Sequence, residues 1–196
     1  MTKKLLFVGA LFIFSIILLG HPAPAQANSS IRNYQRVSSI LSQVKQTEDL
    51  PDTVHKNPLV LKAVGLFLKT ADADDLSDEE MHEKLRSLFP VPRWKEWVPQ
   101  FEIRKVKNGL YLVSLGYAAV TQESSLYLFQ GSAYILIDSG NIGLIHIEDV
   151  SSPDAQLEVT YVRTPGSTQP ESVTAALSNR SGKWRVIDRR IQQVRR

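Results

Sequence analysis

Residues 101–191 form a nearly unbroken series of strand patterns separated by short turn signals, and this series constrains the fold more than any other feature. Residues 101–104 alternate apolar and charged side chains, which is the period-2 pattern of a half-buried strand. Residues 110–120 are apolar on both faces, which predicts a central strand covered on both sides. The series as a whole predicts about seven or eight strands.

Glycine-containing turns separate these strand patterns. They occur at Lys107-Asn108-Gly109, Gln130-Gly131, Ser139-Gly140-Asn141 and Arg180-Ser181-Gly182. Such short links are typical of hairpins between antiparallel neighbours. The strands are therefore expected to form one strongly curved antiparallel meander.

Three helices are predicted before the strands. Apolar residues recur at three- and four-residue spacing over residues 30–45. Asn57-Pro58 is a helix start, and Ser77 with Glu80 forms a capping box. The fold class is thus α+β, with a helical segment (residues 28–98) packed on a sheet domain (residues 99–196) as one globular unit.

Residues 1–27 have the features of a cleaved signal peptide. Lys3 and Lys4 precede an apolar run over residues 5–19, and Ala25-Gln26-Ala27 matches the small-x-small cleavage pattern. The alternative is an uncleaved membrane anchor, but the run of about 15 residues is shorter than the roughly 20 that a spanning helix needs. We therefore expect a periplasmic or secreted protein, cleaved near Ala27.

Composition excludes several kinds of function. The chain has no cysteine, which rules out thiol chemistry and cysteine-based metal sites. It has 23 basic and 20 acidic side chains, and loss of Lys3 and Lys4 with the signal leaves 21 against 20. A nearly neutral mature protein gives no electrostatic support for nucleic-acid binding, so no nucleic acid is expected as a partner.

An acidic run before the third predicted helix partly matches the spacing of a calcium-binding EF-hand loop. Counted from Asp72, carboxylates fall at the third, seventh and twelfth positions. However, Leu76 and Ser77 occupy the fifth and sixth positions, where an oxygen ligand and a glycine are needed. The capping box of Ser77 and Glu80 accounts for the same residues, so we predict no metal site and no cofactor.

Some residue types of a hydrolase lie close together in the sequence. His146 follows Ser139 by seven residues and shares a strand face with Glu148. Residue types alone are a weak indication, because a catalytic triad is defined by its geometry. The chain also lacks the Gly-x-Ser-x-Gly elbow of many serine hydrolases. A hydrolase that uses His146 with Ser139 or Glu148 is therefore the alternative to a non-catalytic function.

Two groups of residues are candidates for binding. Aromatic side chains, which either line a ligand pocket or fill the core, are Trp94, Trp97, Tyr117 and Tyr134. Basic residues of the last strand and tail, which either contact an anionic partner or form a solvated surface, include Arg185, Arg189, Arg190, Arg195 and Arg196. Suitable partners for the basic group are an anionic membrane, a cell-wall polymer or an acidic protein.

The closing strand carries the segment Ser181-Gly182-Lys183-Trp184-Arg185-Val186. This segment resembles the last strand of nuclear-transport-factor-2-like domains. The resemblance implies a cone-shaped sheet preceded by helices, which is an alternative to the meander. Export, a well-formed domain and missing catalytic groups together favour a non-catalytic binding or accessory protein of the cell envelope. Its expected partner is a small ligand or an envelope protein.

Overall fold

The computed structural model describes residues 24–44, 55–70, 73–89, 99–107, 109–117, 123–140, 143–152, 156–165, 169–180 and 182–194. Within these ranges three helices precede eight strands. The helices are α1 (Pro24–Val44), α2 (Pro58–Phe67) and α3 (Asp78–Leu88). The strands are β1 (Pro99–Lys107), β2 (Leu110–Tyr117), β3 (Ser125–Gln130), β4 (Ala133–Ser139), β5 (His146–Ser151), β6 (Gln156–Arg163), β7 (Glu171–Arg180) and β8 (Lys183–Gln193).

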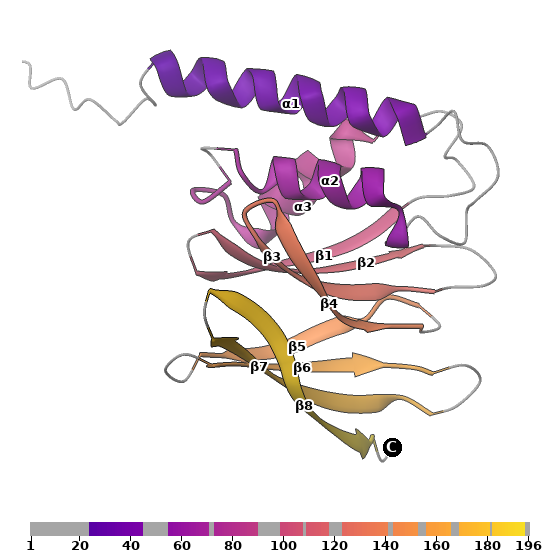
Figure 1. Ribbon diagram of the computed structural model, residues 1–196. Helices are drawn as coiled ribbons and strands as arrows, with labels where there is room; N and C mark the ends of the chain where they lie inside the picture. Colours follow the sequence, from indigo (N-terminus) through magenta and orange to yellow (C-terminus); the bar gives the residue numbers. More distant parts are fainter. Residues whose placement is uncertain are drawn as a thin grey trace, which may run out of the picture.

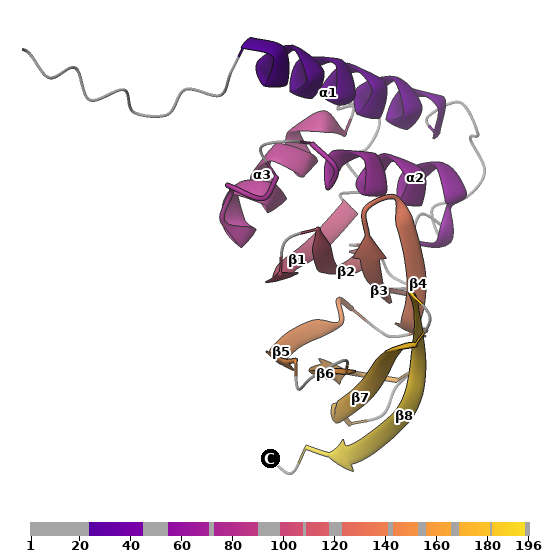
Figure 2. The ribbon, with the colours of Figure 1, turned by 60° about the vertical axis from the view of Figure 1, so that its left-hand side comes forward.

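The strands form two four-stranded antiparallel sheets, which lie one below the other under the helices (Figures 1 and 2). The first sheet has the order β1-β2-β3-β4, and the second has the order β5-β6-β7-β8. Strand β1 contacts β5 and β4 contacts β8, so corresponding edges of the two sheets lie together. The molecule is therefore a β-sandwich with helices on the outer face of its first sheet.

The α+β class is confirmed, but the predicted single meander is wrong in one respect, because the strand series divides into two sheets after β4. The Ser139-Gly140-Asn141 turn does not join paired strands. The Gly140 N–H donates to the carbonyl of Ser124 (3.0 Å), and the hydroxyl of Ser124 donates to the carbonyl of Gly143 (2.6 Å). The connection is thus fixed to the start of β3 while the chain passes to the second sheet. This two-sheet stack also differs from the cone-shaped sheet that the resemblance implied.

The central strands of the first sheet, β2 and β3, are buried on both faces. The helix-facing side of this sheet contributes Phe101, Val113 and Phe129 to a core shared with the helices. Its other side contributes Leu112, Leu128 and their neighbours to a second core, shared with the inner face of the second sheet. Strand β2 is buried from position 110 to position 116, which confirms the prediction of a central strand. A near-continuous apolar run is what burial on both faces requires.

Helices α2 and α3 begin where their capping signals lie. The Asn57 side chain accepts from the N–H of Leu59 (2.9 Å), and Pro58 follows at the first helical position. At α3 both bonds of the capping box are present: the Glu80 N–H donates to the Ser77 hydroxyl (3.2 Å), and the Ser77 N–H donates to the Glu80 carboxylate (2.9 Å). These starts confirm the sequence prediction.

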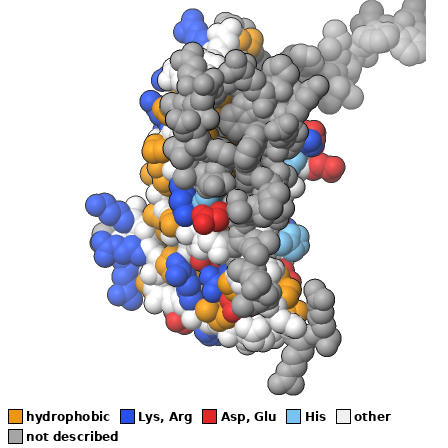
Figure 3. Space-filling model, turned by 90° about the vertical axis from the view of Figure 1, so that its right-hand side faces the viewer, with side chains coloured by type: hydrophobic (Ala, Val, Ile, Leu, Met, Phe, Trp, Pro, Cys, Tyr) orange, Lys and Arg blue, Asp and Glu red, His pale blue; other side chains and the backbone are white. Residues whose placement is uncertain are grey.

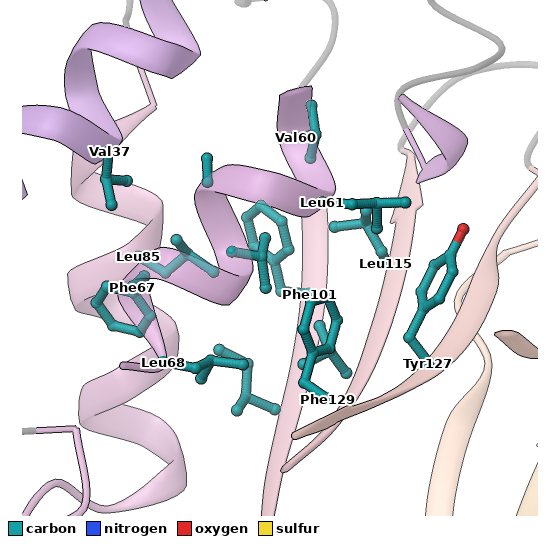
Figure 4. Close-up of a cluster of buried hydrophobic side chains, with 14 of the residues drawn as sticks. Val37, Val60, Leu61, Phe67, Leu68, Leu85, Phe101, Leu115, Tyr127 and Phe129 are labelled. Carbon is teal, nitrogen blue, oxygen red and sulfur yellow. The ribbon is translucent and has the colours of Figure 1, made fainter. Parts of the chain in front are cut away.

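Helix α1 packs on α2 through Val37, Leu41 and Val44, and Figure 4 shows part of this core. The predicted cleavage position, Ala27, lies in the first turn of α1, ahead of these three side chains. The remainder of the predicted signal segment, residues 1–23, lies outside the described residues. No helix in the described ranges combines the length and apolar character needed to cross a membrane.

Candidate binding surface at the β4–β8 edge

Strands β4 and β8 form one edge of the sandwich, because each is the last strand of its sheet. The guanidinium of Arg189 on β8 donates to the carbonyl of Ile137 on β4, which links the two strands. We define the β4–β8 surface by eight exposed residues of these strands. They are Tyr134 and Leu136 on β4 with Lys183, Arg185, Ile187, Arg189, Arg190 and Ile191 on β8.

Exposed apolar side chains are concentrated on this surface. Five large hydrophobic residues are exposed within the described ranges, and four of them, with 41–56% of their area accessible, are Tyr134, Leu136, Ile187 and Ile191. The fifth, Ile31, lies on α1. Single exposed apolar residues are common on proteins, but four on two neighbouring edge strands indicate an interaction site.

Tyr134 is held in place by other rings. Its ring lies edge-on to Tyr127, with centroids 5.7 Å apart, and at a tilt to Phe129, with centroids 5.4 Å apart. Both partners are buried in the helix-facing core, where burial raises the pKa of the Tyr127 phenol. Aromatic pairs of this geometry are favourable. The tyrosine therefore presents a fixed, half-exposed ring at the edge of the first sheet.

The same surface carries positive charge that the fold leaves largely unneutralised. Arg190 pairs with Glu158 of β6 at 3.1 Å. No carboxylate among the described residues lies within ion-pair distance of Lys183, Arg185 or Arg189. Figure 3 shows basic and hydrophobic side chains together along the left-hand side of the molecule, where β4 and β8 lie. The surface is thus both apolar and cationic.

A buried carboxylate beneath this surface joins the two sheets. Asp138 of β4 is 6% exposed, and its Oδ2 accepts from the Tyr161 hydroxyl and from Arg163, each at 2.8 Å. Its Oδ1 accepts from the N–H of Ser139 (2.9 Å). Burial and the neighbouring carboxylate raise the pKa of Tyr161, so its phenol remains a proton donor. We call these residues, with Glu171, the Asp138 clamp.

Arg163 extends the Asp138 clamp to the last two strands. Its Nε donates to Glu171 of β7 (3.1 Å), and the other oxygen of Glu171 accepts from the Gln193 amide of β8 (3.1 Å). Burial alone would lower the pKa of Arg163, but the charge of Asp138 and the bond to Glu171 raise it. The guanidinium therefore stays charged, and the clamp ties β4 to β6, β7 and β8.

The hydrolase residues of the sequence hypothesis occupy different places. His146 lies on β5, at the opposite edge from β4, and 68% of its side chain is exposed. Its Nδ1 lies 3.0 Å from Glu102 of β1. Ser139 lies on β4, and Glu148 is exposed at a bulge of β5. The hydrogen bonds of the described residues do not connect His146 to either of them.

Glu102 is the partner of His146 that sequence reasoning missed. One of its oxygens also accepts from the N–H of Ile147 (3.1 Å), and Arg104 donates to the carbonyl of Ile147 (3.1 Å). The alternation over residues 101–104 correctly placed Glu102 and Arg104 on one strand face. Nothing in the sequence indicated that this face lies against β5, 44 residues further on.

A second histidine pair was also missed. His55 is buried just before α2, and its Nε2 lies 3.4 Å from Glu123, which also pairs with Lys56 (3.2 Å). The carbonyl of His55 accepts from the Tyr127 hydroxyl (2.7 Å). These contacts fix the start of α2 to β3, and their partners are far apart in the sequence.

The acidic run before α3 binds protein groups. Asp74 accepts from the Tyr111 hydroxyl (2.5 Å) and from the N–H of Gly109 (3.2 Å). Asp78 accepts from the N–H of Lys105 (2.9 Å). These bonds join the start of α3 to the β1–β2 hairpin. Within the described ranges no three His, Cys, Asp or Glu side chains are grouped closely enough to hold a metal ion.

Acid is expected to weaken the Asp74 contact. The hydrogen bond from Tyr111 is the largest cause that lowers the pKa of Asp74 below its ordinary value. A lowered folded-state pKa contributes stability above the unfolded pKa, and this contribution is lost as the pH falls through the folded value. Urea titrations at about pH 7 and about pH 2 should therefore show a smaller acid-induced loss for Asp74→Asn than for the wild type. Asp149→Asn, an exposed control on β5, should match the wild type, and equal losses in all three proteins would contradict the prediction.

The structure does not describe several of the predicted binding residues. Trp94, Trp97, Arg195 and Arg196 lie outside the described residues, and Tyr117 is described only as part of the β2 backbone. Tyr134 lies on β4, and Arg185, Arg189 and Arg190 lie on β8, the strand that contacts β4. The structure thus places one predicted aromatic residue on the same edge as three predicted basic residues.

Comparisons with protein-family models, with curated proteins and with solved structures found no match to this chain. The candidate surface is therefore inferred from the charges, exposure and contacts of its own residues.

Proposed function

We propose that this chain is an exported, non-catalytic binding or accessory protein of the cell envelope, and that it binds its partner through the β4–β8 surface. The observation that carries the proposal is the concentration of exposed apolar side chains on these two edge strands, beside unneutralised Arg and Lys side chains. The signal-peptide pattern predicted for residues 1–27 supports the envelope as its location.

Physical chemistry supports a binding role for this surface. Burial of apolar area releases about 25 cal/mol per Å², so four exposed hydrophobic side chains can stabilise a complex. Apolar residues mixed with arginine are also typical of binding interfaces. The Asp138 clamp and the rings beside Tyr134 hold both strands in place, which limits the ordering cost of association.

Site-specific photocrosslinking in the producing cells tests this proposal. A photoreactive amino acid at position 136 or 187 should yield an adduct of one reproducible mass. The matched control is position 148 on β5, which is also exposed but lies at the opposite edge. Because positions 136 and 187 are exposed, replacement should change the free energy of unfolding by no more than about 0.5 kcal/mol. Adducts only at position 148, or none at any position, would reject the β4–β8 surface.

The hydrolase remains the alternative proposal, and the contact between His146 and Glu102 gives it some support. A carboxylate that orients an imidazole is one element of general-base catalysis. His146→Ala distinguishes the two proposals. It would abolish turnover by a hydrolase, whereas a partner bound at the β4–β8 surface would be unaffected.

A further inference from the structure

Strand β8 has a free side along which a further strand can pair. Its eleven residues pair only with β7 among the described strands. A bulge at Ile187 interrupts the register, and positions 188–193 beyond it are regular and exposed. An exposed edge strand presents N–H and C=O groups that an extended peptide can bind.

The pairing with β7 shows which backbone groups face outward. The N–H of Val194 donates to the carbonyl of Pro170 (3.1 Å), so it points toward β7. Backbone direction alternates along an antiparallel strand, and Gln192 therefore also points toward β7. By the same alternation Arg189, Ile191 and Gln193 direct their backbone groups away from it. These three residues form the free pairing edge.

The charge of β8 selects the kind of strand that fits. Four basic residues and one acidic residue, Asp188, give β8 a net charge of +3. Pairing of two copies would bring together two strands of the same net charge, which is unfavourable. The same charges that oppose self-pairing favour a strand with carboxylates. Cations lie on both faces of the strand, because Arg189 and Arg190 are consecutive.

From this geometry we propose that the partner contributes an extended acidic segment that adds to the free edge of β8 as a fifth strand of the second sheet. The inference rests on the proposed function and specifies the partner's chemistry. Backbone hydrogen bonds to Ile191 and Gln193 provide the pairing. Carboxylates of the segment meet Arg185, Arg189 or Arg190, and its apolar residues cover Ile187 and Ile191.

The test uses the mature chain and two blocked peptides of about seven residues, one alternating Glu with Val and the other alternating Lys with Val. The Glu peptide should bind at least about tenfold more tightly than the Lys peptide, and its affinity should fall as the salt concentration rises. On binding, hydrogen exchange should slow at the amides of Ile191 and Gln193. Gln192 is the internal control, because its N–H already points toward β7. Equal binding of both peptides, or binding of neither, would overturn the inference.

A matched pair of variants tests the backbone contact. Ile191→Pro removes an outward N–H while the ladder with β7 stays intact, which edge strands tolerate. It should weaken Glu-peptide binding at least about tenfold, whereas Ile191→Thr, which keeps the N–H, should weaken it less than about threefold. Equal effects of the two substitutions would overturn strand pairing. The exchange measurement on the wild type decides the question if the proline variant does not fold.

Other occupants of the edge give distinct results. If the wild type sediments as a dimer and Ile191→Pro does not, the occupant of the edge is a second copy of the chain and the inference of an acidic partner is wrong. If the chain binds anionic vesicles and Ile191→Pro binds them equally well, the basic residues of β8 contact a lipid surface and the inference of an acidic partner is wrong. If photocrosslinks form at positions 136 and 187 but the peptide experiments fail, this inference falls while the proposed function stands. If the photocrosslinks themselves are absent, the proposed function falls.

Discussion

Asp138→Ala is expected to lower the free energy of unfolding by about 3 kcal/mol, because it leaves the largely buried guanidinium of Arg163 with Glu171 as its remaining carboxylate partner. Arg163 is held between Asp138 and Glu171, and the Tyr161 hydroxyl also loses its acceptor. Equilibrium denaturation in urea, followed by far-ultraviolet circular dichroism, measures the change. Since the Asp138 clamp joins β4 to the second sheet, its loss should separate the two strands that carry the proposed surface.

Two controls separate the charge from the packing at this position. Tyr161→Phe removes one hydrogen bond to Asp138 and should cost about 1–3 kcal/mol, less than Asp138→Ala. Adding Arg163→Met to Asp138→Ala removes the guanidinium that has lost Asp138, so the double variant should lose less than the sum of the two single losses. Strict additivity, or a loss below about 1 kcal/mol for Asp138→Ala, would show that the clamp is not a coupled unit.

Local features of the chain were predicted well because their causes are local. The caps at Asn57 and Ser77 involve residues at most three positions apart, and each is present in the structure. The Lys107-Asn108-Gly109 turn joins paired strands, as does Arg180-Ser181-Gly182. Turns and hydrogen bonds between near neighbours depend on the types of a few adjacent residues, so they can be predicted from the sequence.

The division into two sheets was not predictable in the same way. A period-2 pattern shows that a strand has two faces, but it does not show which other strand covers a face. Leu112 and Leu128 would be buried equally in a closed meander or in a sandwich. The turn at Gly140 has hairpin composition, yet Ser124 and Gly143 fix it as a crossing between sheets. The segment at Gly140 connects the two sheets because it is hydrogen-bonded to Ser124, a residue more than ten positions away in the sequence.

The candidate surface shows the same limit. The sequence identified Arg189 and Arg190 as possible partner contacts, but it did not place Leu136 or Ile187 beside them. Alternation predicts one buried and one exposed side of a strand, whereas an edge strand can expose apolar side chains on either face. Leu136 and Ile187 are exposed because β4 and β8 are the last strands of their sheets.

Phe67→Ala is expected to lower the free energy of unfolding by about 3–5 kcal/mol, because it leaves a cavity where the helices meet the first sheet. Phe67 is fully buried at the end of α2, with its ring centroid 6.1 Å from that of Tyr34 on α1. The same core contains Leu85 of α3 and Phe101 of β1 (Figure 4). Urea denaturation monitored by circular dichroism gives the change, and Phe67→Leu, which keeps most of the volume, should cost less than about 1.5 kcal/mol.

The shape of the Phe67→Ala transition also tests how the helices depend on the sheets. Helix α1 packs mainly on α2, and most of the stability of a helix in a protein comes from such tertiary packing, so α1 should unfold together with the sandwich in one transition. A separate early transition confined to the helical signal would show that the helices form an independent unit. In that case the clamp and the β4–β8 surface would persist without them, and binding at that surface would survive the substitution. A single transition would instead make binding and helix packing fail at the same urea concentration.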